Sequence, residues 1–136
     1  MSTLKVKPWW LQLVVPPYAW VTISPNVYTP DNIDVSRYPE IIAHENTHLA
    51  QQNAMGKYKW LFRYFISRDF RLDQEAKAIA VELAYLPKEF RASRLSSYAE
   101  ALSSKLYWWA ASSKEQATSV INTQFAIREA LHDPKN

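Results

Sequence analysis

Cysteine is absent from this chain of 136 residues. Its absence excludes disulfide bonds, thiolate metal sites and cysteine catalysis, so any bound metal must have histidine and carboxylate ligands. Glycine is almost absent too, with one residue, and no Gly/Ser-rich linker or run of like charges divides the chain. Because 48% of the residues are hydrophobic, they can build one core, and we expect a single domain over residues 1–136.

The chain also lacks a long apolar run. The best candidate, Trp9 to Val15, is interrupted by Gln12 and is followed by Pro16. It is too short for a transmembrane helix and weak as a signal peptide, so we expect no membrane span. The default expectation is then a cytoplasmic location, or a virion-associated one if a phage encodes the chain. We predict that the run forms a strand, and that Trp20–Ile23 and Val27–Tyr28 add short strands, giving a β-rich segment over residues 9–29.

Histidine is scarce, and its placement is the most informative feature of the sequence. Two of the three histidines, His44 and His48, flank Glu45 in the pattern H-E-x-x-H. Residues four apart share one face of a helix, so both imidazoles can bind one metal ion with Glu45 beside them. The alternative is a surface helix with two solvated histidines. The third, His132, lies near the end of a predicted helix, where a histidine interacts favourably with the helix dipole.

The metal-binding interpretation requires a helix around the motif. Pro39 suits a first helical turn, and no Gly or Pro interrupts residues 39–55. Gly56 then stands where a helix commonly ends in a left-handed residue. The sequence therefore predicts a metal helix over residues 39–55.

A third ligand should come from a second helix. Residues 70–86 carry an amphipathic pattern, with Asp69 as a plausible N-cap and Pro87 ending the helix. Glu75 lies on the apolar stripe, where an unpaired carboxylate would cost several kcal/mol. We predict Glu75 as the third ligand, with Glu82 as the main rival and Asp73 as a weaker one. The alternative for Glu75 is a surface pair with Arg71.

At these residues the chain resembles the zincin metallopeptidases, in particular the gluzincin type, whose third ligand is a glutamate. The matching residues are His44-Glu45-Asn46-Thr47-His48 and Glu75-Ala76-Lys77-Ala78 on a later helix. The longer pattern with a third histidine is absent, since positions 51 and 54 are Gln51 and Ala54. The neighbourhood, with Gln51 and Gln52 after the second histidine, is similar to small, minimal zincin domains of bacterial and phage proteins. The resemblance covers roughly Trp20 to Leu86.

The resemblance implies a role for each matching residue. His44, His48 and Glu75 would hold Zn²⁺ and leave a fourth position for water, while Glu45 would act as the general base. The substrate would be a peptide, a protein or the peptide part of peptidoglycan. The expected edge strand for substrate is Val21, Thr22 and Ile23. The transition-state oxyanion would also need a donor, and the sequence does not choose among Tyr98, Tyr107 and Arg91, each of which also fits a packing or surface role.

The rest of the chain reads as helical. Ser97 with Glu100, and Ser112 with Glu115, predict capping boxes that open two C-terminal helices within residues 97–131. Trp108 and Trp109 are too apolar to be wholly exposed, so we expect them to pack in the core or against a protein partner.

The net charge is +3, and much of the positive charge is concentrated in one segment. Residues 57–71 hold five basic side chains and one acid, interleaved with aromatics. Basic and aromatic residues together can bind nucleic acid, but no nucleic-acid motif accompanies them, so we favour a connector beside the site over residues 57–68.

The sequence thus predicts an α+β minimal zincin. It would have a small N-terminal antiparallel or mixed sheet, the metal helix, a second helix carrying the Glu ligand and a C-terminal helical pair. The expected activity is zinc-dependent peptide hydrolysis. The alternative is a structural or assembly protein, such as a virion or export-machine component, that keeps the fold without turnover.

Overall fold

The computed structural model describes residues 3–132, so the outermost residues of the expected domain, 1–2 and 133–136, lie outside the described part. It has an α+β fold in which a small sheet precedes a series of packed helices, as the sequence predicted. In chain order its elements are β1 (Thr3–Val6), α1 (Trp9–Gln12), β2 (Val21–Ile23), β3 (Asn26–Thr29), the 3-10 turn η1 (Val35–Arg37), α2 (Pro39–Met55), α3 (Lys57–Ile66), α4 (Arg68–Tyr85), α5 (Lys88–Leu102), the 3-10 turn η2 (Lys105–Tyr107) and α6 (Lys114–Leu131).

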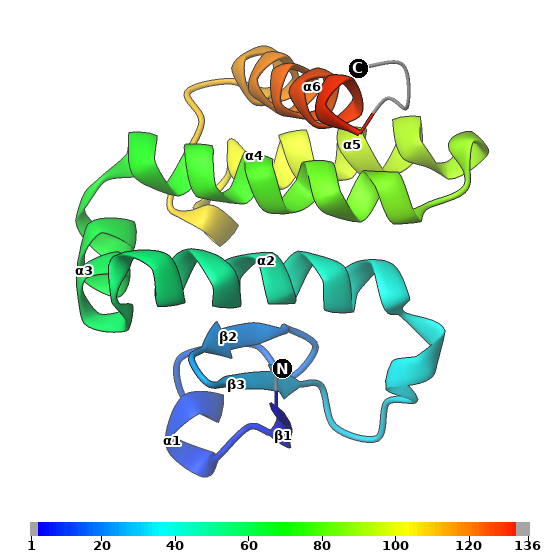
Figure 1. Ribbon diagram of the computed structural model, residues 1–136. Coiled ribbons are helices and arrows are strands. Elements are labelled where there is room, and N and C mark those ends of the chain that lie inside the picture. Colours follow the sequence, from blue (N-terminus) through cyan, green and yellow to red (C-terminus); the bar gives the residue numbers. More distant parts are fainter. Residues whose placement is uncertain (1–2, 133–136) are drawn as a thin grey trace.

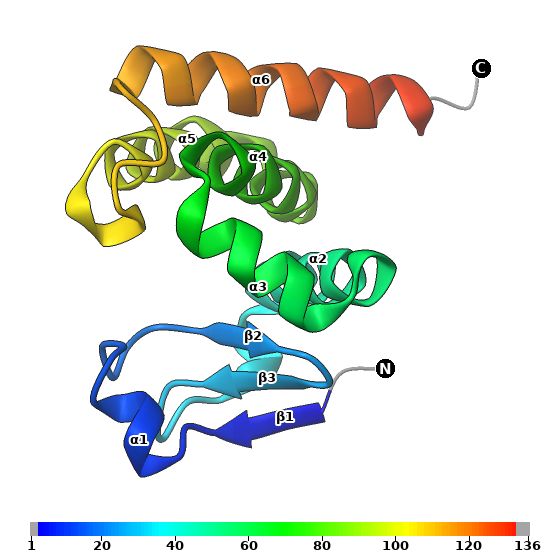
Figure 2. The same ribbon diagram turned by 90° about the vertical axis from the view of Figure 1, so that its left-hand side faces the viewer.

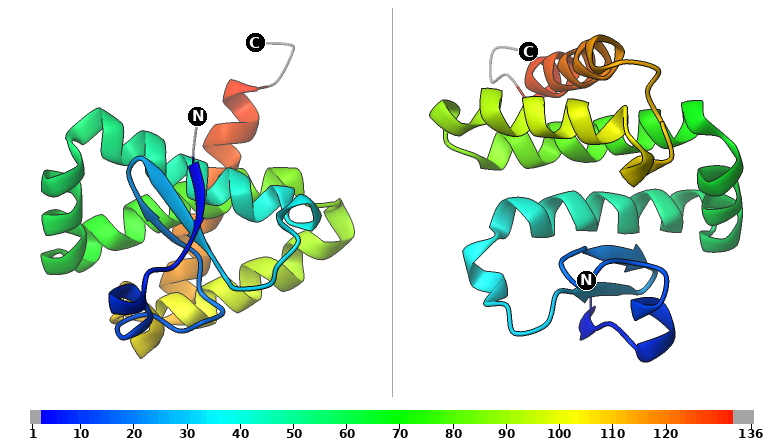
Figure 3. Two further views of the ribbon diagram at one scale, coloured as in Figure 1. Left: turned by 90° about the horizontal axis from the view of Figure 1, so that it is seen from below. Right: turned by 180° about the vertical axis from the view of Figure 1, so that it is seen from behind.

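The elements stack in layers around α2. The sheet lies on one side of α2, α4 and α5 lie on the other, and α6 covers them (Figure 1). The view from behind in Figure 3 shows the same order. The apolar core lies in the helical layers, where buried residues of α4, α5 and α6 such as Ile79, Leu102 and Ile121 form one cluster. No helix within residues 3–132 is both long enough and apolar enough to cross a membrane.

The sheet is mixed, with the strand order β1-β3-β2. β1 runs parallel to β3 and β2 runs antiparallel to it, with Thr22 opposite Val27. β2 is therefore an edge strand, and both β2 and β3 contact α2.

The predicted strand over Trp9–Val15 is wrong. Pro8 precedes the short helix α1, and Gln12 Nε2 closes the turn by donating to the Lys7 carbonyl oxygen over 2.9 Å. Pro16 and Pro17 end the segment, because proline cannot continue a ladder of backbone hydrogen bonds. The real first strand is β1, whose four residues are all exposed, so no alternation of apolar and polar side chains revealed it.

Lys7 anchors the loop after α1 through hydrogen bonds to backbone carbonyl oxygens. This lysine is buried, and its Nζ donates to the carbonyl oxygens of Pro17, Ala19 and Thr29 at 3.2, 2.6 and 3.2 Å. Three carbonyl dipoles replace the water that the ammonium group loses on burial. The contacts hold the chain between α1 and β2 against the sheet.

The metal helix has the predicted bounds. Pro39 is in its first turn, and Gly56 follows it with a φ of 97°, a backbone conformation that favours glycine. Four of its five buried residues are polar, because α2 is covered on two faces. His44 and His48 face α4, whereas Glu45 and Gln52 contact Thr22 of β2.

The expected connector over residues 57–68 is instead helix α3. It contains no Gly or Pro, and its buried Trp60 lies one helical turn before Tyr64, with which it stacks at 4.8 Å between ring centroids. Basic residues alternate with the aromatic ones in this segment, so its helical periodicity was not recognised in the sequence. The next helix, α4, begins at Arg68, and Ser67 is its N-cap because the Ser67 hydroxyl accepts from the Phe70 N–H. The predicted cap, Asp69, is wrong by two residues.

The C-terminal helices also begin at other residues than expected. α5 starts at Lys88, so Ser97 lies inside it and caps nothing. The chain leaves the helix after Leu102, and Ser113 rather than Ser112 caps α6 by accepting from Gln116 N. The predicted helix that opens at Ser97 does not extend beyond Leu102, because residues 103–113 form turns, bends and η2. Trp108 and Trp109 lie in this turn, 50% and 58% exposed, so they are not core residues.

Candidate metal centre

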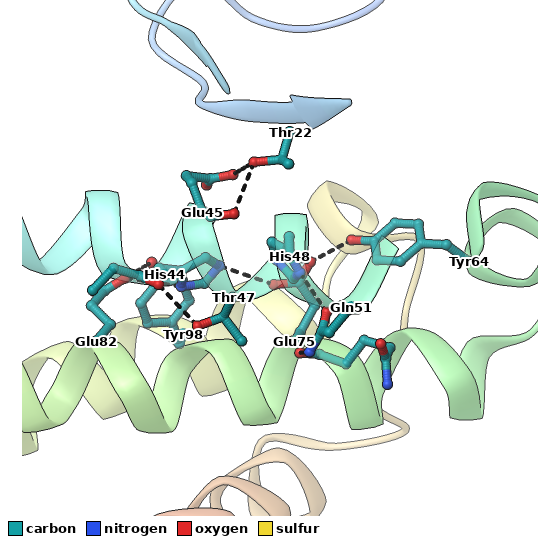
Figure 4. A network of polar contacts seen from close by, with 12 residues as sticks. Thr22, His44, Glu45, Thr47, His48, Gln51, Tyr64, Glu75, Glu82 and Tyr98 are labelled. Atoms are coloured by element: carbon teal, nitrogen blue, oxygen red, sulfur yellow. Dashed lines mark hydrogen bonds and ion pairs between the residues drawn. The ribbon is translucent and has the colours of Figure 1, made fainter. Parts of the chain in front are cut away.

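Three buried side chains form the centre of the site. His44 and His48 on α2 meet Glu75 on α4, and one ligand atom from each lies within 4.8 Å of the others. His44 Nε2 is 3.4 Å from Glu75 Oε2, and His48 Nε2 is 3.3 Å from Glu75 Oε1. The structure therefore brings together the three residues that the sequence proposed as metal ligands, which lie between the two helices in Figure 4.

Gln51 sets the orientation of the His48 ring. Its Nε2 donates to the Gln74 carbonyl oxygen at 3.2 Å, so its Oε1, 2.9 Å from His48 Nδ1, is the acceptor. His48 then carries its proton on Nδ1 when neutral, and its Nε2 lone pair points toward Glu75. Metal-binding histidines are commonly oriented in this way by a partner on the second ring nitrogen.

Glu82 lies against the other histidine, His44, without a matching hydrogen bond. This fully buried carboxylate has its Oε1 3.0 Å from His44 Nδ1, although the contact is not aligned as a hydrogen bond. It is held in turn by Arg94 through Oε2 and by the Tyr98 hydroxyl, which donates to Oε1 over 2.7 Å. Glu82, the sequence-based rival of Glu75, thus lies on the far side of the His44 ring, while Glu75 lies between the two histidines.

Glu75 is only partly satisfied by the protein. Tyr64 donates its hydroxyl to Glu75 Oε1 over 2.6 Å. Glu75 Oε2 is buried and has no hydrogen-bond donor among residues 3–132. A buried carboxylate oxygen without a donor is costly, so this atom is where a cation would be stabilising.

The spacing of the ligand atoms can be compared with that around a bound metal ion. Two ligand atoms bound at about 2.0–2.2 Å to one tetrahedral zinc lie about 3.3–3.5 Å apart. The distance of 3.4 Å between His44 Nε2 and Glu75 Oε2 falls in that range, and the three ligand atoms all lie within 4.8 Å of one another. The 3.3 Å contact of His48 is to Oε1, the oxygen that Tyr64 holds. Two histidines and a glutamate are an established catalytic zinc set, and the group has three members among the described residues.

The charges fit a divalent cation as well. Arg94 offsets the charge of Glu82, which leaves Glu45 and Glu75 as two buried carboxylates beside two histidines. A divalent ion would neutralise this pair with both imidazoles uncharged. Without an ion, the imidazoles themselves must supply the positive charge.

The pKa values reflect that second situation. Burial disfavours the charged His44 ring, but the Glu75 and Glu82 carboxylates outweigh it and raise the pKa of His44 to about 10. The pKa of His48 is raised too, because Glu75 outweighs the cost of burial. Burial opposes the charge of Glu75, yet the two histidines lower the pKa of its carboxyl well below the usual range. The metal-free site is therefore a protonated histidine–carboxylate cluster.

Glu45 is anchored separately, on the face of α2 toward the sheet. Thr22 donates its hydroxyl to Glu45 Oε2 over 2.7 Å. The strand is fixed to the helix by Gln52, whose Nε2 donates to the Thr22 carbonyl oxygen and whose Oε1 accepts from Ser24 N, both at 2.8 Å. Gln52 is fully buried, so β2 and α2 are joined rigidly beside the histidines.

A pocket of about 510 Å³ opens onto these residues. His44, Glu45, His48 and Glu75 contribute its histidine and carboxylate lining, and Tyr64 and Tyr107 add two hydroxyl-bearing side chains. Its other walls are mainly apolar side chains from α1 and the following loop, β2, α3 and η2, among them Leu11, Val15, Trp20, Leu61 and Trp108.

The three candidate oxyanion donors lie in different places. Tyr107 lines the pocket. Burial first, and then the charge of Glu75, raise the pKa of Tyr107 well above its usual value. Tyr98 is committed to Glu82 and stacks on His44 from the side of α5. Arg91 is outside the pocket lining and donates to the Leu86 carbonyl oxygen over 3.1 Å.

The remaining predicted residues are placed as follows. Val21, Thr22 and Ile23 form β2 and line the pocket. Asp73 is outside the pocket lining and pairs with Lys77 over 2.9 Å. Arg71 forms no surface pair with Glu75, because its buried guanidinium donates to backbone carbonyl oxygens of α3 and η2.

Sequence reasoning missed Tyr64, the orienting role of Gln51 and the contacts of Glu82 and Thr22. A signal existed for Gln51, which follows His48 by three residues and so lies near it on a helix. Tyr64 and Thr22 approach the site from other elements, and nothing in the sequence pattern pairs them with Glu75 or Glu45.

Compared with known proteins, the chain gives no significant match to a family model, a curated protein or a solved structure. The interpretation of the site rests on its geometry.

Proposed function

We propose that this chain is a zinc-dependent metallopeptidase of the zincin type. The observation that carries the proposal is the pocket itself. On its lining a His–His–Glu set with metal-like spacing lies beside a separately anchored glutamate, Glu45. A purely structural zinc site is usually closed by four protein ligands, whereas this group has three and faces a pocket.

His44, His48 and Glu75 would hold the metal. Zinc, when bound, supplies a Lewis acid that polarises a carbonyl group and makes a water molecule acidic near neutral pH. The protein prepares two of the three ligands: Gln51 orients His48, and Tyr64 holds one oxygen of Glu75 so that the other is left for the ion.

Glu45 is the proposed general base. Thr22 holds Oε2 of its carboxylate, which fixes the group at the edge of the pocket beside the histidines. Glu45 would accept a proton from the attacking water as its oxygen adds to the peptide carbonyl carbon. The same proton would pass to the leaving nitrogen as the C–N bond breaks. Tyr107 is the proposed donor to the oxyanion, because it lines the pocket and its raised pKa keeps the hydroxyl protonated.

The walls indicate the kind of peptide that fits. An extended peptide would lie along β2, the edge strand of the sheet. The Gln52 side chain already forms hydrogen bonds with the Thr22 carbonyl oxygen and the Ser24 N–H. A substrate backbone would therefore form its hydrogen bonds with the part of β2 before Thr22. Aliphatic and aromatic side chains dominate the walls, which favours apolar residues next to the cleaved bond.

The test is cleavage of peptide libraries, unfolded proteins and peptidoglycan fragments by the zinc-loaded chain. We expect activity that a chelator abolishes and added zinc restores. Glu45→Gln should abolish it without loss of metal, whereas Glu40→Gln, a change of the same kind on the same helix, should keep it. If wild type and Glu45→Gln are equally inert while folded and zinc-loaded, the chain is instead a non-catalytic scaffold protein.

A further inference from the structure

The mouth of the pocket is apolar and exposed. Three residues both line the pocket and show half or more of their surface to solvent: Val14 at 74%, Phe65 at 59% and Trp108 at 50%. They come from the loop after α1, from α3 and from the turn after η2. In Figure 2, α1 and the yellow segment that contains η2 lie on the same side of the molecule.

The same three segments expose further apolar side chains. They include Trp9 and Leu13 at α1, Phe62 and Ile66 on α3, and Leu106 and Trp109 at η2, each more than half exposed. An apolar surface gathered around one opening is unusual for a face that only meets water. We call these three segments, residues 5–18, 57–68 and 103–113, the mouth face.

The mouth face carries positive charge only. The chain has 13 acidic residues, and none of them lies in residues 5–18, 57–68 or 103–113. Exposed Lys59, Arg63 and Lys105 stand among the apolar side chains. Basic side chains among exposed aromatic and aliphatic groups are complementary to a binding partner that has negative charge at its surface and an apolar interior beneath it.

The turn at η2 is held in a costly conformation that keeps its tryptophans outside. Trp108 and Trp109 have φ values of 50° and 49°, in a left-handed region that bulky residues rarely adopt. The buried Arg71 fixes this turn by donating to the carbonyl oxygens of Tyr107 and Trp108 at 3.1 Å each. Such strain is typically kept where it serves a function.

We propose that the mouth face binds the surface of an anionic lipid membrane. Tryptophans favour the headgroup region, aliphatic side chains reach the acyl boundary, and the basic side chains pair with lipid phosphates. Exposed Leu13, Ile66 and Leu106 cannot stack on bases, which favours lipid over nucleic acid. Binding in this orientation directs the pocket toward the bilayer. The proposal does not depend on hydrolysis.

The test is co-sedimentation of the wild-type chain with vesicles. Vesicles containing phosphatidylglycerol are compared with vesicles of phosphatidylcholine alone, and tryptophan fluorescence reports insertion. We expect binding to the anionic vesicles, at least about tenfold weaker to the neutral ones and weakened by salt, with a blue shift of the emission.

Two variants and a matched control locate the binding face. Leu13→Asp and Ile66→Asp should each weaken binding about tenfold or more, because a charge replaces an inserted apolar group. Leu131→Asp is the control, since Leu131 on α6 is 76% exposed, as Leu13 is, but lies outside the mouth face. Circular dichroism checks that all three remain folded.

Three results would overturn the proposal. The first is equal loss of binding in the control and in both variants. The second is absence of vesicle binding together with self-association that Leu13→Asp abolishes, which would make the face an interface between copies. The third is tight binding to single-stranded DNA without binding to vesicles.

Discussion

Tyr64 is the residue whose removal tests the site most cleanly. Its hydroxyl donates to Glu75 Oε1 over 2.6 Å, and both residues line the pocket. Tyr64→Phe deletes one oxygen and keeps the ring that stacks on Trp60. A hydrogen bond to a charged group contributes about 1.5–3 kcal/mol, so the free energy of unfolding should fall by about that amount. Without Tyr64, Glu75 is no longer held as a one-oxygen ligand, and zinc affinity should fall about 10- to 100-fold.

The matched control is Tyr98→Phe. Tyr98 also donates its hydroxyl to a buried carboxylate, but to Glu82, which contacts the proposed metal ligand His44 on the side away from Glu75. We expect a similar loss of stability and a smaller loss of zinc affinity. Competition with a zinc chelator measures affinity, and denaturant unfolding of the metal-free protein measures stability. If Tyr64→Phe binds zinc as tightly as wild type, or if the two variants lose affinity equally, Tyr64 does not position the ligand.

Three further predictions concern other parts of the site. Thr22→Val should leave zinc content unchanged and lower the turnover number about tenfold or more, because Glu45 loses the donor to its Oε2; unchanged kinetics would refute this role. Tyr107→Phe should reduce the turnover number roughly a hundredfold while KM changes little, and an effect on KM alone would exclude an oxyanion donor. Zinc binding near neutral pH should release about one proton or more, because His44 with a pKa of about 10 is protonated in the metal-free protein and must be neutral to bind. Calorimetry in buffers of different ionisation enthalpy measures this release, and equal binding enthalpies in all of them would contradict it.

The same pKa shift has a consequence for the metal-free fold. A raised histidine pKa stabilises the folded state below the ordinary value of 6.5. That contribution declines as the pH rises and is lost once it passes about 10, where the folded-state group titrates.

The local part of the site could be predicted from the sequence. The spacing of His44 and His48 fixes their common face once residues 39–55 are helical, and Pro39 and Gly56 mark that helix. Glu75 could be chosen because a carboxylate on an apolar stripe needs a partner, and it is indeed buried between the two histidines.

The non-local part could not be predicted. Tyr64 meets Glu75 only because α3 folds back beside α4, and its segment looked like a charged connector. Glu82 resembled a ligand in the sequence because it lies two helical turns after Glu75. Only the packing of α5 against α4 shows that Arg94 and Tyr98 form hydrogen bonds with its carboxylate. The segment at Trp9–Val15 was misread for a related reason, since short apolar runs do not distinguish a strand from a helical turn.

The most direct test of the account is the metal content of the purified chain and of two glutamate variants. Elemental mass spectrometry after exposure to zinc and removal of the excess should find about one zinc ion per chain in wild type. Glu75→Ala should lose it, whereas Glu82→Ala, if folded, should retain zinc at reduced affinity, because Glu82 contacts His44 and does not face the other ligands. Absence of stoichiometric zinc in wild type, or full zinc in Glu75→Ala with loss in Glu82→Ala, would contradict the account.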